Sequence, residues 1–147
     1  MHKLCLVAVG CLLSATAFAA EVVVLTAEAQ KARVAQITEA QNKVMLKGST
    51  PADVDELFAF YTDDFVYHHE VYGGDYARAT LYANTLRLQA MGKYDKTEPR
   101  YRILTQIAGH NAIAVERQEN HKGTLKNHLA VFEFRGDKVS KIIEYWK

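Results

Sequence analysis

Hydrophobic positions follow a helical period in the first part of the chain and a strand period in the last part. Within Thr26–Leu46, apolar residues such as Val34 and Ile37 fall on one face, and no glycine or proline interrupts the run. This pattern predicts a helix. A second helix is predicted over Pro51–Tyr61, because Thr50 followed by a proline is a common helix start.

The middle of the chain predicts one strand and one further helix. Phe65–Tyr72 is rich in aromatic and β-branched residues, which favours a strand. Gly73-Gly74-Asp75 predicts a turn. A third helix is predicted over Tyr76–Met91, which ends at Gly92.

The last part of the chain alternates between apolar and polar residues in runs separated by turn residues. The runs with this strand character are 101–108, 112–121, 125–134 and 139–146. Consecutive strands joined by tight turns pair antiparallel. Helices that precede such a meander indicate an α+β fold, in which the helices pack on one face of a curved sheet. The concave face of such a sheet is a natural site for a small molecule.

The N-terminal segment has the three parts of a secretory signal peptide. A short basic start precedes the apolar run Leu4–Leu13, and the small residues around Ala17-Phe18-Ala19 follow. This arrangement predicts cleavage between Ala19 and Ala20, so that 1–19 is a signal peptide and 20–147 a single domain. The apolar run is short for a bilayer-spanning helix, which makes a retained membrane anchor the less favoured alternative.

Composition narrows the classes of function. The 147 residues include 18 Lys and Arg against 17 Asp and Glu, so there is no positive excess to support nucleic-acid binding. Cys5 and Cys11 both lie in the predicted signal peptide, and the mature chain is therefore expected to have no disulfide or cysteine-ligated zinc. Because Cys11 follows Gly10, lipidation at Cys11 is an alternative to plain secretion. The sequence has no phosphate-binding glycine loop, and no cofactor is expected.

Two stretches of the chain carry a family resemblance. Residues 52–68 combine a predicted helix with Tyr61, Asp64 and His68 in a fixed spacing, and 132–146 form a closing hairpin that ends in an aromatic pair. These stretches, with Gly74 and the helix after it, resemble the nuclear transport factor 2-like superfamily, and within it the SnoaL-like (polyketide cyclase-like) branch. The resemblance covers roughly Ala52 to Lys147.

The resemblance implies a cone-shaped α+β fold, with a curved, mostly antiparallel sheet on about three helices, an internal pocket and often a homodimer through the sheet. Family members include isomerases, cyclases, dehydratases and domains that only bind. In cyclase-like members, an Asp on the strand before the last turn acts as the acid–base group. Aligned through Arg135, that position is Phe132 here. The neighbouring Glu133 is no simple substitute, since adjacent strand residues point to opposite faces.

His68 and His69 are candidate general bases, because imidazole titrates near neutral pH. Strand alternation places His69 with Phe65 and Tyr67 on one face, and His68 with Val66 on the other. The family resemblance favours His68 as the pocket residue, whereas the apolar neighbours of His69 favour His69. The alternative role for either is a hydrogen-bonded histidine in the wall or at the rim of a pocket.

A second candidate group combines an acid, a base and a cation. Arg117, Glu119 and His121 alternate on one face of the 112–121 run, and His128 lies across the next turn. Arg117 and His128 are therefore further candidate catalytic residues. A solvated sheet face with cross-strand charge pairs would show the same pattern. A zinc or iron site would need a histidine from each of the two groups, and we expect no metal.

Tyrosine is frequent, with eight residues in the chain. An apolar cavity with a few phenols suits a flat or aromatic ligand, although buried tyrosines also fill ordinary cores. The candidate ligand-binding residues are Tyr61, Tyr67, Tyr72, Tyr82, Glu119, His121 and Phe132. Tyr145 and Trp146 are expected to close the sheet and any dimer contact.

We therefore expect a periplasmic or secreted protein that binds a small apolar or aromatic molecule in an aromatic, histidine-containing pocket. One alternative is an enzyme of the cyclase, isomerase or dehydratase kind with a histidine general base. Another is a dimeric protein-interaction module with a filled core. A homodimer is expected, without nucleic-acid binding and without a stable membrane span.

Overall fold

The computed structural model describes residues 23–121 and 123–146. The predicted signal peptide, its cleavage site at Ala19/Ala20 and both cysteines lie outside the described residues, so secretion and lipidation at Cys11 stay predictions. Among the described residues, no helix is both long enough and apolar enough to cross a membrane.

The helices of the described chain are α1 (Ala27–Met45), α2 (Pro51–Ala59) and α3 (Arg78–Ala90). The first two begin where side chains satisfy free backbone groups. The hydroxyl of Thr26 accepts a hydrogen bond from the backbone N–H of Ala29 at 3.2 Å at the start of α1. At the start of α2, the carboxylate of Asp53 accepts from the backbone N–H and the hydroxyl of Thr50, at 2.6 and 2.8 Å.

The strands form one sheet in the order β2-β1-β6-β5-β4-β3. They are β1 (Tyr61–His69), β2 (Asp75–Ala77), β3 (Tyr101–Ala108), β4 (Ala112–His121), β5 (Thr124–Arg135) and β6 (Lys138–Tyr145). As predicted, β3 to β6 form an antiparallel meander. The first strand, β1, pairs with the last strand, β6, in parallel and with β2 antiparallel. The sheet is therefore mostly antiparallel, with one parallel pair in its interior.

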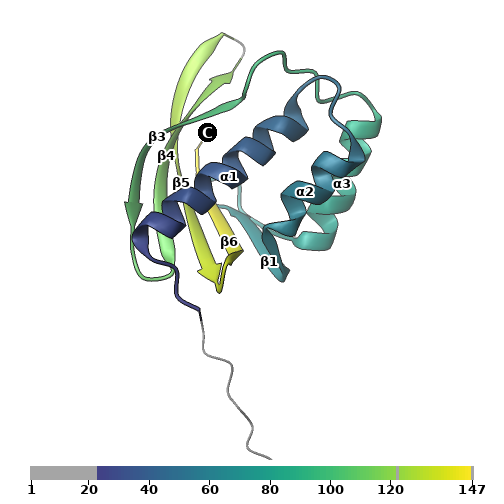
Figure 1. The fold of residues 1–147 in the computed structure, drawn as a ribbon. Helices are drawn as coiled ribbons and strands as arrows, with labels where there is room; N and C mark the ends of the chain where they lie inside the picture. Colours follow the sequence, from purple (N-terminus) through teal and green to yellow (C-terminus); the bar gives the residue numbers. More distant parts are fainter. Residues whose placement is uncertain (1–22, 122, 147) are drawn as a thin grey trace, which may run out of the picture.

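The helices cover one face of the curved sheet (Figure 1). α1 crosses the concave side next to β3 and β4, while α2 and α3 pack against each other and against β1. Val34 of α1 packs in one core with Val115 and Phe132 of the sheet. The side chain of Asn42 fixes α1 to β3, since it donates to the carbonyl of Tyr101 at 2.9 Å and accepts from its N–H at 2.8 Å. The predicted α+β fold, a curved sheet on three helices, is confirmed.

The end of the second helix differs from the prediction, at the junction of α2 and β1. The second helix was predicted to reach Tyr61, but it ends at Ala59 and Tyr61 is the first residue of β1. The backbone N–H of Val139 donates to the carbonyl of Phe60 at 2.9 Å, so pairing with β6 begins directly after the helix. Tyr61 continues the helical spacing of apolar residues, but its pairing with β6 determines that it is in a strand.

The end of the first strand, β1, also differs from the prediction. The strand was predicted to continue to Tyr72, but it ends at His69, whose carbonyl accepts from the N–H of Gly73 at 2.8 Å. Gly73 has a φ of 73°, a left-handed conformation that glycine adopts without strain. The short strand Asp75–Ala77 follows, where the sequence predicted a turn and a helix start. A strand of this length is too short to show an alternation.

Candidate ligand-binding site

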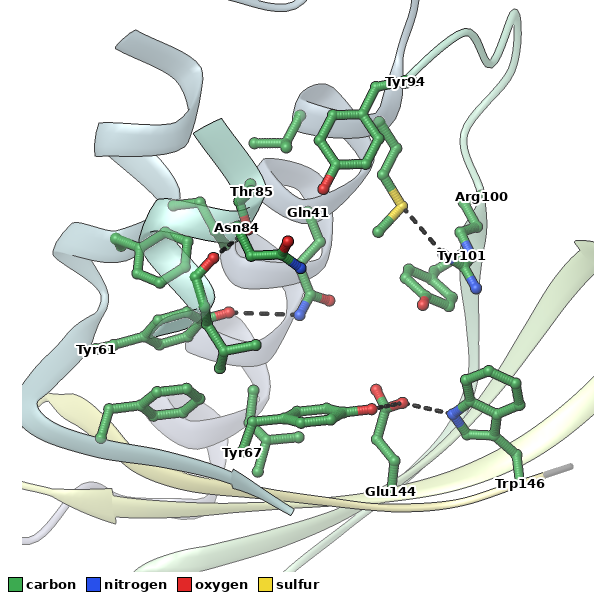
Figure 2. A pocket seen from close by; sticks show the side chains of 17 residues that line it. Gln41, Tyr61, Tyr67, Asn84, Thr85, Tyr94, Arg100, Tyr101, Glu144 and Trp146 are labelled. Atoms are coloured by element: carbon green, nitrogen blue, oxygen red, sulfur yellow. Dashed lines mark hydrogen bonds between the residues drawn. The ribbon is translucent and has the colours of Figure 1, made fainter. Parts of the chain in front are cut away.

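A cavity of about 380 Å³ lies between the helices and the inner face of the sheet (Figure 2). Its walls are mostly apolar or aromatic, and we call it the tyrosine cavity. The apolar and aromatic lining residues are Val44, Met45, Leu57, Phe58, Tyr61, Phe65, Tyr67, Leu81, Tyr94, Tyr101, Ile142 and Trp146. The polar ones are Gln41, Asn84, Thr85, Arg100 and Glu144. Small-molecule pockets commonly measure about 300–1,000 Å³ and are lined in this way.

Glu144 forms the polar floor of the tyrosine cavity (Figure 2). It faces inward with Ile142 on β6 and is only 4% exposed. Its Oε1 atom pairs with the guanidinium of Arg117 from β4. Its Oε2 atom accepts from the hydroxyl of Tyr67 at 2.8 Å and from the indole N–H of Trp146. Both carboxylate oxygens are therefore engaged by donors from other parts of the chain.

Arg117 pairs with Glu144 without lining the cavity and is itself fully buried. Its Nη1 atom donates to the Gln41 side chain of α1 at 2.8 Å, and its guanidinium lies 4.2 Å from the ring centre of Tyr101. Burial alone would raise the pKa of Glu144, but the Arg117 guanidinium and the hydrogen-bond donors outweigh it and hold that pKa below its usual range. The floor is an ionised, internally paired carboxylate.

The tyrosine hydroxyls of the cavity remain protonated at neutral pH. Burial raises the pKa of Tyr61 and Tyr67, and for Tyr67 the nearby Glu144 adds to the effect. Burial, followed by Glu144, raises the pKa of Tyr101 to about 12. The hydroxyl of Tyr61 accepts from the Gln41 side chain at 3.4 Å. These phenols are therefore neutral groups that donate and accept hydrogen bonds.

The structure places the two predicted histidines on opposite faces of β1. His68 lies away from the tyrosine cavity, with Nδ1 2.7 Å from Asp75 and Nε2 2.9 Å from Glu70. The hydrogen bond with Asp75 is the main cause that raises the pKa of His68. The family-based expectation that His68 faces the pocket is thus corrected, because alternation from the buried Phe65 turns His68 outward.

His69 lies on the inner face but outside the cavity lining. Its Nδ1 atom accepts from the backbone N–H of Tyr72 at 3.3 Å, so the neutral ring carries its proton on Nε2. That Nε2 atom is buried and has no partner among the described residues. The His69 ring lies 4.9 Å from the ring of Trp146, which stands between it and the cavity. The prediction of a histidine-containing pocket therefore does not hold for the tyrosine cavity, whose described lining residues include no histidine.

The charged group predicted on β4 and β5 is buried rather than solvated. Arg117, Glu119 and His128 are each at most 5% exposed, whereas the side chain of His121 is 48% exposed. Arg100 donates to Glu119 at 2.8 Å. Burial, and then the charge of Arg117, lower the pKa of His128, so its imidazole is neutral at neutral pH. The structure brings Arg117 to the cavity floor and places Glu119 and His128 beyond Trp146.

The predicted aromatic ligand-binding residues divide into three groups. Tyr61 and Tyr67 line the tyrosine cavity. Tyr72 is 66% exposed, because the chain has already left the strand, and the hydroxyl of Tyr82 donates to an aspartate of α2 outside the cavity. Phe132 is fully buried in the core, 5.7 Å from the Arg117 guanidinium, and does not line the cavity.

Sequence reasoning missed Glu144, Gln41 and Arg100 as site residues. For Glu144 a signal existed, since it alternates with the apolar Ile142 and with Trp146 on one face of the last run. A glutamate on the buried face of a strand needs an ion-pair or hydrogen-bond partner. For Gln41 a signal existed as well, since it falls on the same helical stripe as Ile37 and Val44. Arg100 gave no comparable signal, because a loop arginine is usually exposed.

Among the described residues, no three His, Cys, Asp or Glu side chains converge in a way that could hold a metal ion. His121 and His128 both approach Glu119, at 3.6 and 3.9 Å, but these are single contacts of one carboxylate.

Comparison with known proteins places the fold. No protein-family model and no curated protein matches the chain. Among solved structures, a nuclear transport factor 2-like (NTF2-like) protein from Pseudomonas aeruginosa is similar with a TM-score of 0.60 and 16% identity, over 81% of this chain and 98% of that one. A second, from Burkholderia pseudomallei, is similar with a TM-score of 0.57 and 15% identity, over 81% of this chain and 91% of that one. A third, from Cytophaga hutchinsonii, has a TM-score of 0.56 and 8% identity, over 80% of this chain and 88% of that one.

These likenesses establish the NTF2-like fold. All three solved proteins are described as being of unknown function. One fold of this kind hosts binding domains and enzymes, so function has to be argued from the site.

Proposed function

We propose that this chain is a secreted, SnoaL-like protein that binds a small, mostly apolar or aromatic molecule in the tyrosine cavity. The observation that carries the proposal is an apolar cavity whose polar floor, the Arg117–Glu144 pair, is already internally paired. Such a floor is neutral in sum, so a neutral ligand covers it without leaving a buried charge unpaired. The hydroxyls of Tyr61 and Tyr67 offer directional hydrogen bonds to the ligand.

The same geometry favours binding over general-base catalysis in this cavity. A general base needs a free lone pair within reach of the substrate. Both oxygens of Glu144 are engaged and its pKa is lowered, while His69 lies behind Trp146. An isomerase or cyclase would therefore need a base other than Glu144 or His69.

A homodimer through the outer face of the sheet is part of the proposal. Ile107, Leu129 and Tyr145 are 70%, 42% and 40% exposed, and Leu129 lies directly across from Tyr145 in the β5–β6 register. Exposed apolar side chains gathered on one sheet face are typical of an interface. The predicted signal peptide supports a periplasmic or secreted location.

Native mass spectrometry of the protein purified from the cells that make it tests the binding proposal. We expect a retained mass of a few hundred daltons, roughly the size that such a cavity holds. Asn84→Phe should abolish the retained mass, because Asn84 lines the cavity with an exposed side chain, and the larger ring narrows the entrance. Ala83→Phe is the matched control, since it adds the same ring one residue away on the exposed face of α3.

The proposal fails if the protein carries no small molecule and aromatic compounds do not raise its melting temperature. It fails equally if both variants keep the ligand, because the ligand would then lie elsewhere. A ligand that disappears only in Asn84→Phe identifies the tyrosine cavity as its site.

A further inference from the structure

A second hollow lies beyond Trp146, toward the hairpin end of β4 and β5. It has a volume of about 640 Å³ and is lined by Glu119 and His121 of β4, Lys126 and His128 of β5, Tyr72 and Trp146 among others. We call it the histidine hollow. Trp146 lines both this hollow and the tyrosine cavity, and thus forms a wall between them.

The strongest observation in the histidine hollow is the unpartnered imidazole of His128. Its side chain is only 2% exposed, and neither ring nitrogen has a hydrogen-bond partner among the described residues. The nearest acidic atom, Oε2 of Glu119, is 3.9 Å from Nε2, which is too long for a hydrogen bond. Buried polar groups normally find partners, and leaving one unpaired costs about 1–3 kcal/mol. The ring therefore points to a partner that is not part of the described chain.

The charges around His128 favour an anionic partner with a single charge. Glu119 is paired with Arg100 at 2.8 Å. Lys126 lies directly across from Glu119 in the β4–β5 register, is exposed and makes no ion pair within residues 23–121 and 123–146. Two cations and one carboxylate leave one positive charge in excess. A carboxylate ligand balances this charge, whereas a dianion such as phosphate would leave one negative charge in excess.

The remaining walls of the histidine hollow are aromatic. The rings of Tyr72 and Trp146 lie 6.3 Å apart and nearly perpendicular, and His128 lies 5.7 Å from Trp146, so these rings pack against one another. A ligand ring would stack on the sides of Tyr72 and Trp146 that line the hollow. A ligand with a ring and an acidic group would contact the aromatic walls and the donors together.

We infer that the histidine hollow is a second binding site, for a small aromatic carboxylic acid whose carboxylate accepts hydrogen bonds from His128 and Lys126. The site does not depend on a ligand in the tyrosine cavity. Trp146 is the only tryptophan of the chain and lines both sites, so its fluorescence reports on binding in either one, and variants of each site distinguish them.

Calorimetric titration with 3-phenylpropanoate and with 3-phenylpropan-1-ol tests the inference, because the two probes share one carbon skeleton and differ in the head group. We expect the acid to bind about tenfold more tightly than the alcohol and to change the fluorescence of Trp146. Lys126→Met and His128→Phe should each weaken acid binding by about tenfold and leave alcohol binding unchanged. His128→Phe also removes the unpartnered nitrogens, so the variant is expected to fold.

Two controls make the result specific. Lys138→Met removes an exposed lysine at the opposite end of β5 and β6 and should bind the acid like the wild type. Asn84→Phe, which narrows the tyrosine cavity, should also bind the acid normally. Equal binding of acid and alcohol, no binding of the acid, or full acid binding by Lys126→Met and His128→Phe overturns the inference. Loss of acid binding in Asn84→Phe overturns it too, since the acid would then occupy the tyrosine cavity.

Discussion

The buried side chain of Glu144 accepts three side-chain hydrogen bonds. Its donors are Tyr67 on β1, Arg117 on β4 and Trp146 after β6, so one side chain joins three separate parts of the chain. Removing one member of a buried ion pair leaves the other charge without compensation, which is far costlier than losing a surface pair. The floor of the cavity is therefore also a structural centre.

Glu144→Gln is expected to lower the free energy of unfolding at neutral pH by about 3–5 kcal/mol, because Arg117 stays buried without its counter-charge. Urea denaturation measures this change. The control Glu133→Gln, on the neighbouring strand, should stay within about 0.5 kcal/mol of the wild type. A loss in Glu144→Gln no larger than in the control would show that the pair contributes little.

The advantage of the wild type over Glu144→Gln should shrink as the pH falls. The pKa of Glu144 is lower in the folded than in the unfolded protein, where it is near 4.5, so its stabilisation is fully present above that pH. The stabilisation is lost as the pH falls through the folded value, since the protonated acid resembles glutamine. Denaturation curves of both proteins between neutral and acidic pH measure the gap, and a gap that widens toward acid contradicts the assignment.

At this scale the sequence predicted some of the site. Alternation alone placed His69, Phe65 and Tyr67 together on one face but left open whether that face is the inner one, and the structure turns it inward. Alternation left open whether Arg117 and Glu119 are solvent-exposed. In the sequence, a buried charged residue cannot be told from an exposed one until its ion-pair partner is known. The partner of Arg117 lies on β6, and no local pattern relates the two strands.

Elements were predicted best where local signals and long-range pairing agree. The runs 101–108 and 112–121 match β3 and β4, since turn residues flank both. The junction of α2 and β1 was placed too late, because the ladder with β6 decides it. β2 is set by its pairing with β1 and by the contact of His68 with Asp75, neither of which the sequence displays.

The start of α2 offers a test at the scale of one element. Asp53→Ala removes the acceptor for the N–H and hydroxyl of Thr50 and should destabilise the protein by about 1 kcal/mol. Asp53→Asn keeps an oxygen acceptor and should recover most of the loss. Thermal unfolding of both variants gives the comparison, and equal losses would assign the effect to the charge pair with Lys43 instead.

For the whole molecule, the order of helices followed by a meander was enough to predict the α+β class. It was not enough to predict that the first strand joins the last one in parallel, since only consecutive strands have a pairing set by short turns. The position of the cavity follows from that closure, because β1 and β6 bring Tyr67 beside Glu144.

The proposed homodimer through the outer face of the sheet can be tested by one substitution. Leu129→Lys should convert the proposed dimer to a monomer in light scattering coupled to size exclusion, because a charge replaces an exposed apolar side chain at the interface. Thr124→Lys, near the end of the hairpin, introduces the same charge and should leave the mass unchanged. A wild-type protein that is monomeric at all concentrations contradicts the proposed dimer.

The parallel pairing of β1 with β6 also bears on how the chain folds. The hydroxyl of Tyr67 and the carboxylate of Glu144 are 77 residues apart in the chain, whereas Arg117 and Glu144 are 27 apart. Closing the longer loop costs more conformational entropy, and contacts between distant segments slow folding. The meander with its ion pair is thus the part that assembles at lower entropic cost, and β1 docks against it at a higher one. A molecule bound on Glu144 and Tyr67 would hold that docked arrangement in place, so the unfolding rate of the chain becomes a measure of occupancy.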